Sequence, residues 1–157
     1  MGNKLPDLDK FDLDLLKLVQ SDASASAEAL GAAVGLSGSA VLRRLRQLRE
    51  TGIINREVAI VATDKLGPRL RIIANVELER DRADQLGALV ELLQEQPEIQ
   101  QAYYISGDAD LLLIVIVSEI SDYDRLTAEL VSKHPIIKRI KTSVVFRELK
   151  VGLLVPV

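Results

Sequence analysis

Five arginines lie close together in an otherwise acidic chain and offer the chemistry of polyanion binding. They are Arg43, Arg44, Arg46, Arg49 and Arg56, and with two glutamates they give residues 37–57 a net charge of +3. Residues 1–36 carry −3, and the whole chain of 157 residues also carries −3. Guanidinium groups bind phosphate oxygens and the edge of guanine through paired hydrogen bonds. A local basic surface of this kind indicates one docking site for nucleic acid.

A second group of polar residues lies around the longest apolar run, 111–117. Gly107, Asp108 and Asp110 precede this run, and Thr142 and Ser143 follow it near the end of the chain. Carboxylates accept hydrogen bonds from an ammonium group, whereas hydroxyls and turn amides donate to a carboxylate. Side chains of these types can bind the polar groups of a small molecule. The residue types also allow another interpretation, in which the aspartates only shape a hairpin turn with Gly107 at positive φ.

Other kinds of chemistry are poorly represented. The chain has no cysteine, which excludes disulfides, thiol catalysis and cysteine-ligated zinc. Its single histidine, His134, precedes Pro135 and has no second metal ligand near it in the sequence. We therefore expect no catalytic residue, no metal site and no cofactor. The N-terminus has no apolar signal segment, and no apolar run reaches the roughly 18 residues of a membrane helix. A cytoplasmic protein without membrane contact is expected.

The arginine cluster requires a scaffold, and the apolar spacing predicts three helices, 9–20, 27–34 and 37–50. Ser26 and Ser37 are suitable N-caps for the second and third helices, and Gly35 between them can end the second. Residues 53–61 are rich in β-formers and predict a small hairpin. Three helices followed by a hairpin form a winged helix-turn-helix. In the third helix one face is apolar, and the opposite face together with its flanks is polar.

The turn at 35–37 is short and contains a glycine, as a helix-turn-helix requires. The third helix would then enter the major groove with its small N-terminal residues first and its arginines behind. The predicted contacts to double-stranded DNA are Ser37, Ser39, Ala40, Arg43, Arg44, Arg46 and Gln47. The alternative interpretation is a three-helix bundle whose arginines form a solvated face.

The second half of the chain has a different pattern. Strands are predicted at 70–78, 99–105, 111–117 and 136–149, the last with a bulge, and helices at 81–96 and 121–133. The order β-α-β-β-α-β is that of the ferredoxin-like unit. The fold class is therefore α+β. We predict a DNA-binding domain at 1–62, a linker at 63–68 and a sensor and oligomerisation domain at 69–157.

Three segments carry a resemblance to a known family. They are LDKFDLDLLKLVQSDA, VGLSGSAVLRRLRQLRETGII, and GDADLLLIVIV with IKRIKTSVVFRELK. In this order they resemble the leucine-responsive regulatory protein/AsnC (Lrp/AsnC, feast/famine) family of transcriptional regulators. The resemblance implies a helix-turn-helix joined to a ferredoxin-like RAM domain, with dimers that assemble into octamers and an amino acid bound between dimers. It also implies that Gly107 and Asp110 (the GxxD turn), with Thr142 and Ser143, line the effector pocket.

The sequence departs from the family pattern at three positions. Ser24 replaces a basic residue, Gly38 replaces a common proline, and Gly31 replaces an alanine packed between helices. Glycine in a helix costs about 1 kcal/mol relative to alanine, so Gly31 is expected to loosen the second helix.

The function expected is sequence-specific regulation of transcription, modulated by a small molecule that is an amino acid by resemblance. Two alternatives stay open: an architectural octamer that needs no effector, and an enzyme, because haem-biosynthesis decarboxylases resemble the same family. Against catalysis, the single histidine lies in a turn and the arginines lie in the third helix. A homodimer is the minimum assembly, because the 111–117 strand is apolar on both faces while helices cover only one.

Overall fold

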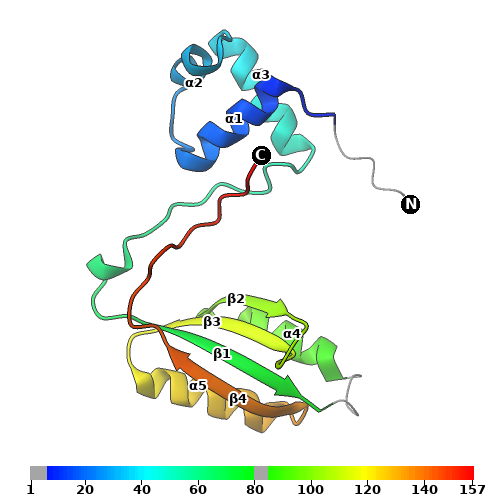
Figure 1. Ribbon diagram of the computed structural model, residues 1–157, viewed down its shortest axis with the longest axis vertical. Coiled ribbons are helices and arrows are strands. Elements are labelled where there is room, and N and C mark those ends of the chain that lie inside the picture. The colour runs from blue at the N-terminus through cyan, green and yellow to red at the C-terminus, as the bar shows by residue number, and fades with distance from the viewer. Residues whose placement is uncertain (1–6, 80–84) are drawn as a thin grey trace. The chain divides into compact units, whose positions relative to one another are not determined.

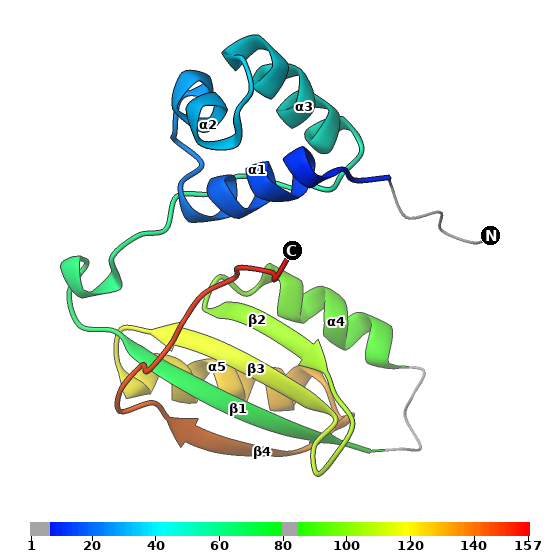
Figure 2. The ribbon, with the colours of Figure 1, turned by 45° about the horizontal axis from the view of Figure 1, so that its top comes forward.

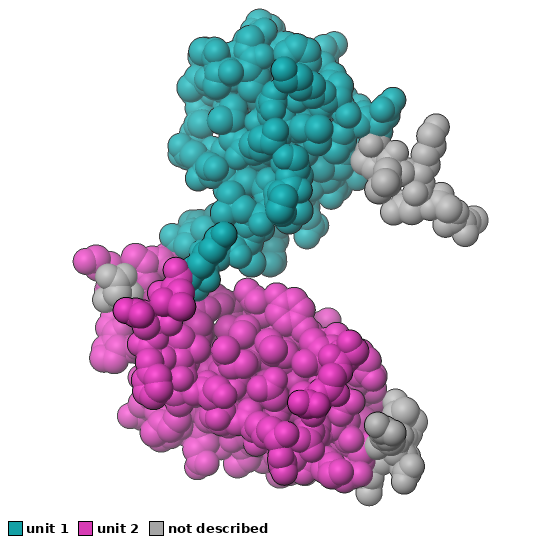
Figure 3. Space-filling model, viewed as in Figure 1, with its two compact units in different colours: residues 1–60, 150–157 teal, residues 61–149 magenta. Residues whose placement is uncertain are grey.

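The computed structural model describes residues 7–79 and 85–157. They divide into two compact units, one of residues up to 60 together with Lys150–Val157, the other of Val61–Leu149 (Figure 3). The first unit contains α1 (Lys10–Ser21), α2 (Ala27–Val34) and α3 (Gly38–Glu50) (Figure 1). The second contains β1 (Leu70–Leu78), α4 (Leu86–Glu95), β2 (Ile99–Tyr104), β3 (Leu111–Val117), α5 (Ile120–Lys133) and β4 (Ile137–Val144), after a 3₁₀ turn at Thr63–Lys65.

Local signals in the sequence define the three helices of the first unit. The hydroxyls of Ser26 and Ser37 accept hydrogen bonds from backbone amides in the first turns of α2 and α3, and Gly35 ends α2 in the left-handed conformation. Asp9 caps α1. The apolar faces meet in one small core of Leu15, Leu16, Leu30, Val41, Leu45 and Leu48. The predicted helices and caps are confirmed.

The predicted hairpin after α3 is wrong. Residues 55–62 form neither helix nor strand. Val58 and Ile60 are exposed, Ile60 by 90%. An isolated two-stranded ribbon needs an apolar surface to pack against. Ile53 and Ile54 pack against the helical core, but Val58 and Ile60 do not, so β propensity alone did not produce a wing.

The second unit is a four-stranded antiparallel sheet in the order β2-β3-β1-β4, with α4 and α5 on one face (Figure 2). This is the expected ferredoxin-like arrangement. Alternate residues of β1 and β3 point to the helices, and the pairs Ile72–Val115 and Ala74–Leu113 lie in the core. The predicted bulge is present, because the β1–β4 register shifts between Glu77 and Leu78.

The end of the chain differs from expectation. The last strand stops at Val144 and does not reach residue 149. Phe146 is fully exposed, and Lys150–Val157 belongs to the first unit although the sequence suggested a single domain from 69 onward. The first turn of the predicted 81–96 helix lies outside the described residues. None of the helices that the structure describes is long and apolar enough to cross a membrane.

Candidate DNA-recognition helix and effector site

The turn between α2 and α3 depends on a close approach of two backbones. The amide of Leu36 donates to the carbonyl of Gly31 at 2.9 Å. A Cβ on Gly31 would lie 2.4 Å from the Leu36 carbonyl oxygen, well inside contact distance. The expectation that Gly31 only loosens α2 is therefore wrong. Glycine is the residue that lets the turn close beneath α3.

The N-terminal end of α3 presents a small, polar, exposed surface. The Ser37 hydroxyl accepts from the amide of Ala40 at 3.3 Å and lies 3.1 Å from the Ser39 hydroxyl. Ser39, Arg43 and Arg46 are exposed, and at about 100° per residue they share one face of the helix. The surface combines free amides at a helix N-terminus with guanidinium groups one and two turns further on. Such a surface can hold a phosphate and reach base edges.

Arg44 does not lie with this group. Its Nη1 donates to Oδ2 of Asp9 and Oδ1 of Asp12, both at 2.8 Å. Its guanidinium carbon lies 5.5 Å from the centroid of the Phe11 ring. Arg44 thus binds the N-terminus of α1 and is only partly exposed. Sequence reasoning grouped it with the DNA-facing arginines, although it lies only about 40° from Leu48 in the buried stripe of α3.

The charges at this junction reinforce one another. Asp9 and Asp12 form a capping box, in which each carboxylate accepts from the backbone amide of the other residue. The amide of Asp12, followed by the guanidinium of Arg44, holds the pKa of Asp9 below its usual range. The same carboxylates, Asp12 foremost, raise the pKa of Arg44. Gln47 borders a small cavity of about 170 Å³ beside this junction.

The remaining arginines of the cluster have separate roles. Arg49 forms an ion pair with Glu57, with 2.7 Å between Nη2 and Oε1. Arg56 is exposed in the extended segment after α3. The exposed positive charge of α3 itself is therefore concentrated at Arg43 and Arg46.

Asp110 is firmly integrated into the sheet. Its Oδ2 accepts from the amide of Leu78 at 2.7 Å, and its own amide donates to the carbonyl of Val76 at 2.9 Å. Gly107 has φ of 137° and lies with Asp108 on the exposed part of the turn. The turn therefore has the structural role that the residue types allowed, while Gly107 and Asp108 stay exposed.

Thr142 and Ser143 lie on the other side of β1 and on opposite faces of the sheet. Thr142 pairs with Ala74, and its hydroxyl lies 2.7 Å from the Tyr123 hydroxyl of α5. Ser143 pairs with Ile73 on the face without helices. Strand spacing places Asp110 on the order of 14 Å from Thr142. Within one chain, the predicted effector residues do not form a single pocket.

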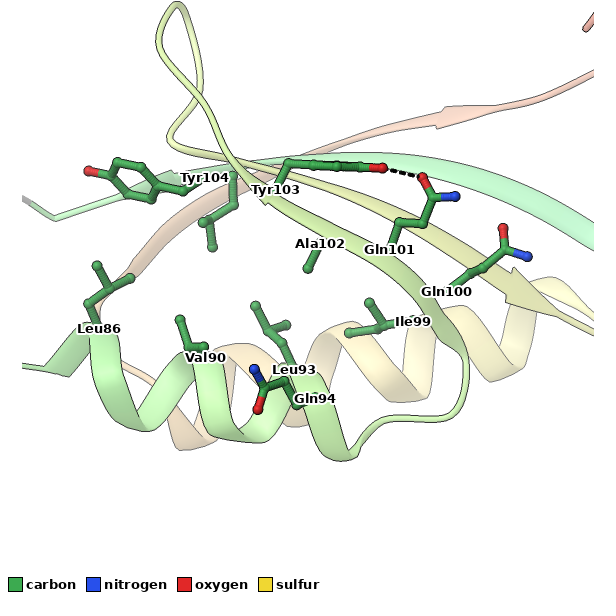
Figure 4. A pocket seen from close by; sticks show the side chains of 11 residues that line it. Leu86, Val90, Leu93, Gln94, Ile99, Gln100, Gln101, Ala102, Tyr103 and Tyr104 are labelled. Carbon is green, nitrogen blue, oxygen red and sulfur yellow. Dashed lines mark hydrogen bonds between the residues drawn. The ribbon is translucent and has the colours of Figure 1, made fainter. Parts of the chain in front are cut away.

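A cavity that sequence reasoning missed lies between α4 and the edge strand β2. Its volume is about 510 Å³, and its walls are apolar side chains of α4 facing those of β2 (Figure 4). Tyr104 and Leu111, which flank the 105–110 turn, lie at one end. The remaining lining residues are Leu86, Val90, Leu93, Gln94, Ile99, Gln100, Gln101, Ala102 and Tyr103, none of them charged. Val90 of α4, an apolar side chain that stays partly exposed, is one of these lining residues.

Among residues 7–79 and 85–157, no three His, Asp or Glu side chains gather closely enough to hold an ion. His134 ends α5, where its amide donates to the carbonyl of Leu130.

Comparisons with known proteins match both units. The pattern of the AsnC-type helix-turn-helix domain matches residues 8–49, and that of the Lrp/AsnC ligand binding domain matches residues 71–154. The chain is 36% identical over 151 residues to the uncharacterized HTH-type transcriptional regulator y4tD of Sinorhizobium fredii, covering 96% of this chain and 89% of that protein. It is 34% identical to the glutamate uptake regulatory protein of Zymomonas mobilis, covering 95% and 90%.

Solved structures agree with this assignment. An AsnC family transcriptional regulator from Agrobacterium tumefaciens superimposes with a TM-score of 0.88 at 27% identity, over 95% of this chain and 97% of that one. A transcriptional regulator from Neisseria meningitidis, solved in complex with L-Met, has the same fold, with a TM-score of 0.85 at 24% identity over 95% and 96%. The helix-turn-helix, the four-stranded sheet and both pattern matches lead to one conclusion: the chain belongs to the Lrp/AsnC family of DNA-binding transcriptional regulators.

Proposed function

We propose that this regulator contacts double-stranded DNA in the cytoplasm through the exposed face of α3, and that its activity is regulatory and not enzymatic. The observation that carries the proposal is the surface of Ser37, Ser39, Arg43 and Arg46, which is capped, exposed and free of ion pairs among the described contacts. Arg44 is assigned to holding α1 against α3. The recognition set is therefore Ser37, Ser39, Ala40, Arg43, Arg46 and Gln47.

The sheet face without helices supports a homodimer. Ile73, Ile114 and Ile116 lie on that face beside Leu112 and are only partly buried within one chain. A second copy that packs sheet against sheet would cover them, since an apolar sheet face needs a partner. The higher assembly, an octamer, follows from the family resemblance.

The effector proposed is an amino acid. The exposed turn at Gly107 and Asp108 offers amides and a carboxylate to its charged ends, and the cavity beside this turn offers uncharged walls to its side chain. Residues Asp110, Thr142 and Ser143 would complete the site only across an assembly contact, because one chain separates them. The structure of the Neisseria meningitidis relative with L-Met is consistent with an effector of this class.

The test of DNA recognition uses the salt dependence of binding. Arg43→Ala should weaken binding to a cognate operator by about 1–3 kcal/mol if Arg43 contacts a base. Arg46→Ala should reduce the slope of log affinity against log salt by about one if Arg46 contacts a phosphate. Unchanged affinity and slope in both variants would remove α3 from the recognition role.

The test of the effector is a thermal-shift screen of the twenty amino acids, because a ligand that binds only the folded state raises its melting temperature. Stabilisation by an amino acid with an uncharged side chain is expected. DNA binding without stabilisation by any amino acid would favour the architectural assembly that needs no effector.

A further inference from the structure

The two edge strands of the sheet, β2 and β4, differ in composition. In the strand order, β2 lies at one edge beside β3, and its sequence IQQAYY contains no charged residue. β4 lies at the other edge and carries Lys138, Arg139 and Lys141. Charged side chains, lysine above all, keep the free edge of a sheet from pairing with further strands. β4 has this protection and β2 does not.

The hydrogen-bond pattern identifies the backbone groups at the free edge of β2. Directly after β2, the amide of Ile105 donates to the carbonyl of Asp110 at 2.9 Å. Bonded and non-bonded positions alternate along an antiparallel pair. In the β2–β3 register the next bonded position is therefore Tyr103. Ala102 and Tyr104 consequently direct their N–H and C=O groups away from β3, toward the free edge.

The side chains at the end of β2 are exposed on both faces of the sheet. In β3, alternate residues are buried beneath the helices, whereas Ala102, Tyr103 and Tyr104 of β2 are all exposed. Tyr103 is exposed by 49% and Tyr104 by 70%. Ala102 and Tyr104 border the cavity on the helix face. Tyr103 lies on the other face, where its hydroxyl donates to Gln101 Oε1 at 2.7 Å (Figure 4).

The same strand of a second copy is complementary to this edge. A two-fold axis beside Tyr103 makes two β2 strands antiparallel, with Ala102 of each copy opposite Tyr104 of the other. Both pairs have backbone groups that face outward, so they can form about four hydrogen bonds. On the helix face, the small Ala102 gives space to the Tyr104 ring of the second copy. On the other face the two Tyr103 rings lie directly opposite each other, and aromatic cross-strand pairs stabilise sheets.

We propose that β2 is a contact between two copies of this chain, in which antiparallel β2 strands join two sheets edge to edge. The inference rests on the proposed assembly and names the contact between homodimers, which is distinct from the sheet-face contact within one homodimer. Both contacts are isologous, and two different isologous contacts per chain can generate a closed assembly of dimers. Tyr104 of the second copy also joins the wall of the proposed effector cavity, so that ligand binding and assembly are linked.

The first experiment is a disulfide cross-link in the full chain. Because the native chain has no cysteine, Tyr103→Cys carries a single thiol. Residue 103 faces its own copy in a non-bonded pair, where Cα atoms lie about 4.5 Å apart, within the range of a disulfide. Mild oxidation should therefore convert most of this variant into covalent dimers.

Tyr104→Cys is the matched control for the cross-link. Position 104 is the more exposed of the two, but strand spacing places it roughly 9 Å from its own copy, too far for a disulfide. It should cross-link about fivefold less than Tyr103→Cys. Absence of covalent dimers in Tyr103→Cys, or equal amounts in both variants, would overturn the proposal.

The second experiment removes one outward-facing amide. Ala102→Pro deletes an N–H group at the free edge and leaves the bonds to β3 in place, and proline is tolerated at such edge positions. Light scattering should show a parental assembly larger than a dimer. In Ala102→Pro this assembly should separate into dimers at a concentration about tenfold higher or more. Ala102→Ser keeps the amide and should match the parental protein. Parental assembly in a folded Ala102→Pro would contradict the proposal.

The two experiments separate this proposal from the proposed function, because neither involves DNA. A parental assembly larger than a dimer without cross-linking of Tyr103→Cys would refute the β2 contact and leave the proposed assembly intact. A parental dimer that cross-links through Tyr103→Cys would support the β2 contact and refute the sheet-face dimer. A parental dimer that does not cross-link would refute pairing between copies and assign the β2 edge to a strand of another protein.

Discussion

The recognition surface on α3 and the predicted effector residues of the sheet were inferred from the same kind of evidence, yet the structure treats them differently. The α3 residues occupy one exposed surface, with Arg44 as the exception. The sheet residues lie on both sides of β1 and on both faces of the sheet. In a helix, the residues that lie next to one another on the surface are set by the helical period within a few turns. In a sheet, they also depend on pairing with strands far away in sequence.

Substitution of Gly31 is expected to have the largest effect on stability, and it tests the helix-turn-helix, the region that was predicted well. Gly31→Ala should destabilise the first unit by about 1–3 kcal/mol, because the new Cβ has to displace the backbone of Leu36. Circular dichroism during thermal unfolding would measure the loss. The control is Gly87→Ala in α4, where nothing lies within 4 Å of the added Cβ and helix propensity should give a small gain. A gain in both variants would show that the turn beneath α3 is adaptable.

The part of the fold that could be predicted is the part governed by local rules. Caps at Ser26 and Ser37, the left-handed Gly35 and the strand and helix order all follow from neighbouring residue types. The predicted hairpin at 53–61 did not form, because strand propensity needs a partner surface and the sequence does not specify one. The role of Gly31 was not predicted, because the need for glycine comes from the carbonyl of Leu36, five residues away across the turn. Helix propensity does not describe the geometry of such a turn.

The site was harder to predict than the fold. The spacing of Asp9 and Asp12 suits a capping box, but nothing local pairs them with Arg44, which is 32 residues away from Asp12. The α4–β2 cavity likewise requires knowing that β2 is an edge strand. Long-range pairing decided both cases.

Asp110 tests the poorly predicted region and is expected to have the second largest effect. Asp110→Ala leaves the amide of Leu78 without its acceptor and should cost about 1–3 kcal/mol of stability. Asp110→Asn keeps an acceptor oxygen and should melt close to the parental temperature. An amino acid that stabilises the parental protein is then titrated into Asp110→Asn, which separates a role of the carboxylate in the turn from a role in effector binding. Retained affinity in Asp110→Asn assigns the carboxylate to the turn, and lost affinity at an unchanged melting temperature assigns it to the effector.

Arg43 and Arg44 are adjacent in sequence, but we expect them to have different roles. Arg44→Ala should destabilise the first unit by on the order of 1 kcal/mol through loss of the Phe11 and carboxylate contacts. It should leave the salt slope of DNA binding unchanged, measured under conditions where the variant is fully folded. Arg43→Ala is the control with the opposite pattern, weaker binding and an unchanged melting temperature. A reduced salt slope in Arg44→Ala would return Arg44 to the recognition surface.

The smallest effect is a pH dependence at the same junction, and its sign follows from the direction of one pKa shift. The amide of Asp12 and the guanidinium of Arg44 lower the pKa of Asp9 in the folded protein. A lowered pKa contributes stability above the unfolded value, near 3.9, and the contribution is lost as pH falls through the folded value. Asn is also a good N-cap, so Asp9→Asn removes mainly the charge. The two proteins should therefore differ in melting temperature at pH 7, and the difference should shrink as pH falls through the lowered pKa of Asp9. Asp14→Asn, which removes a surface pair with Lys17, is the matched control. A difference that persists unchanged at low pH would mean that Asp9 stabilises α1 by its shape and not by its charge.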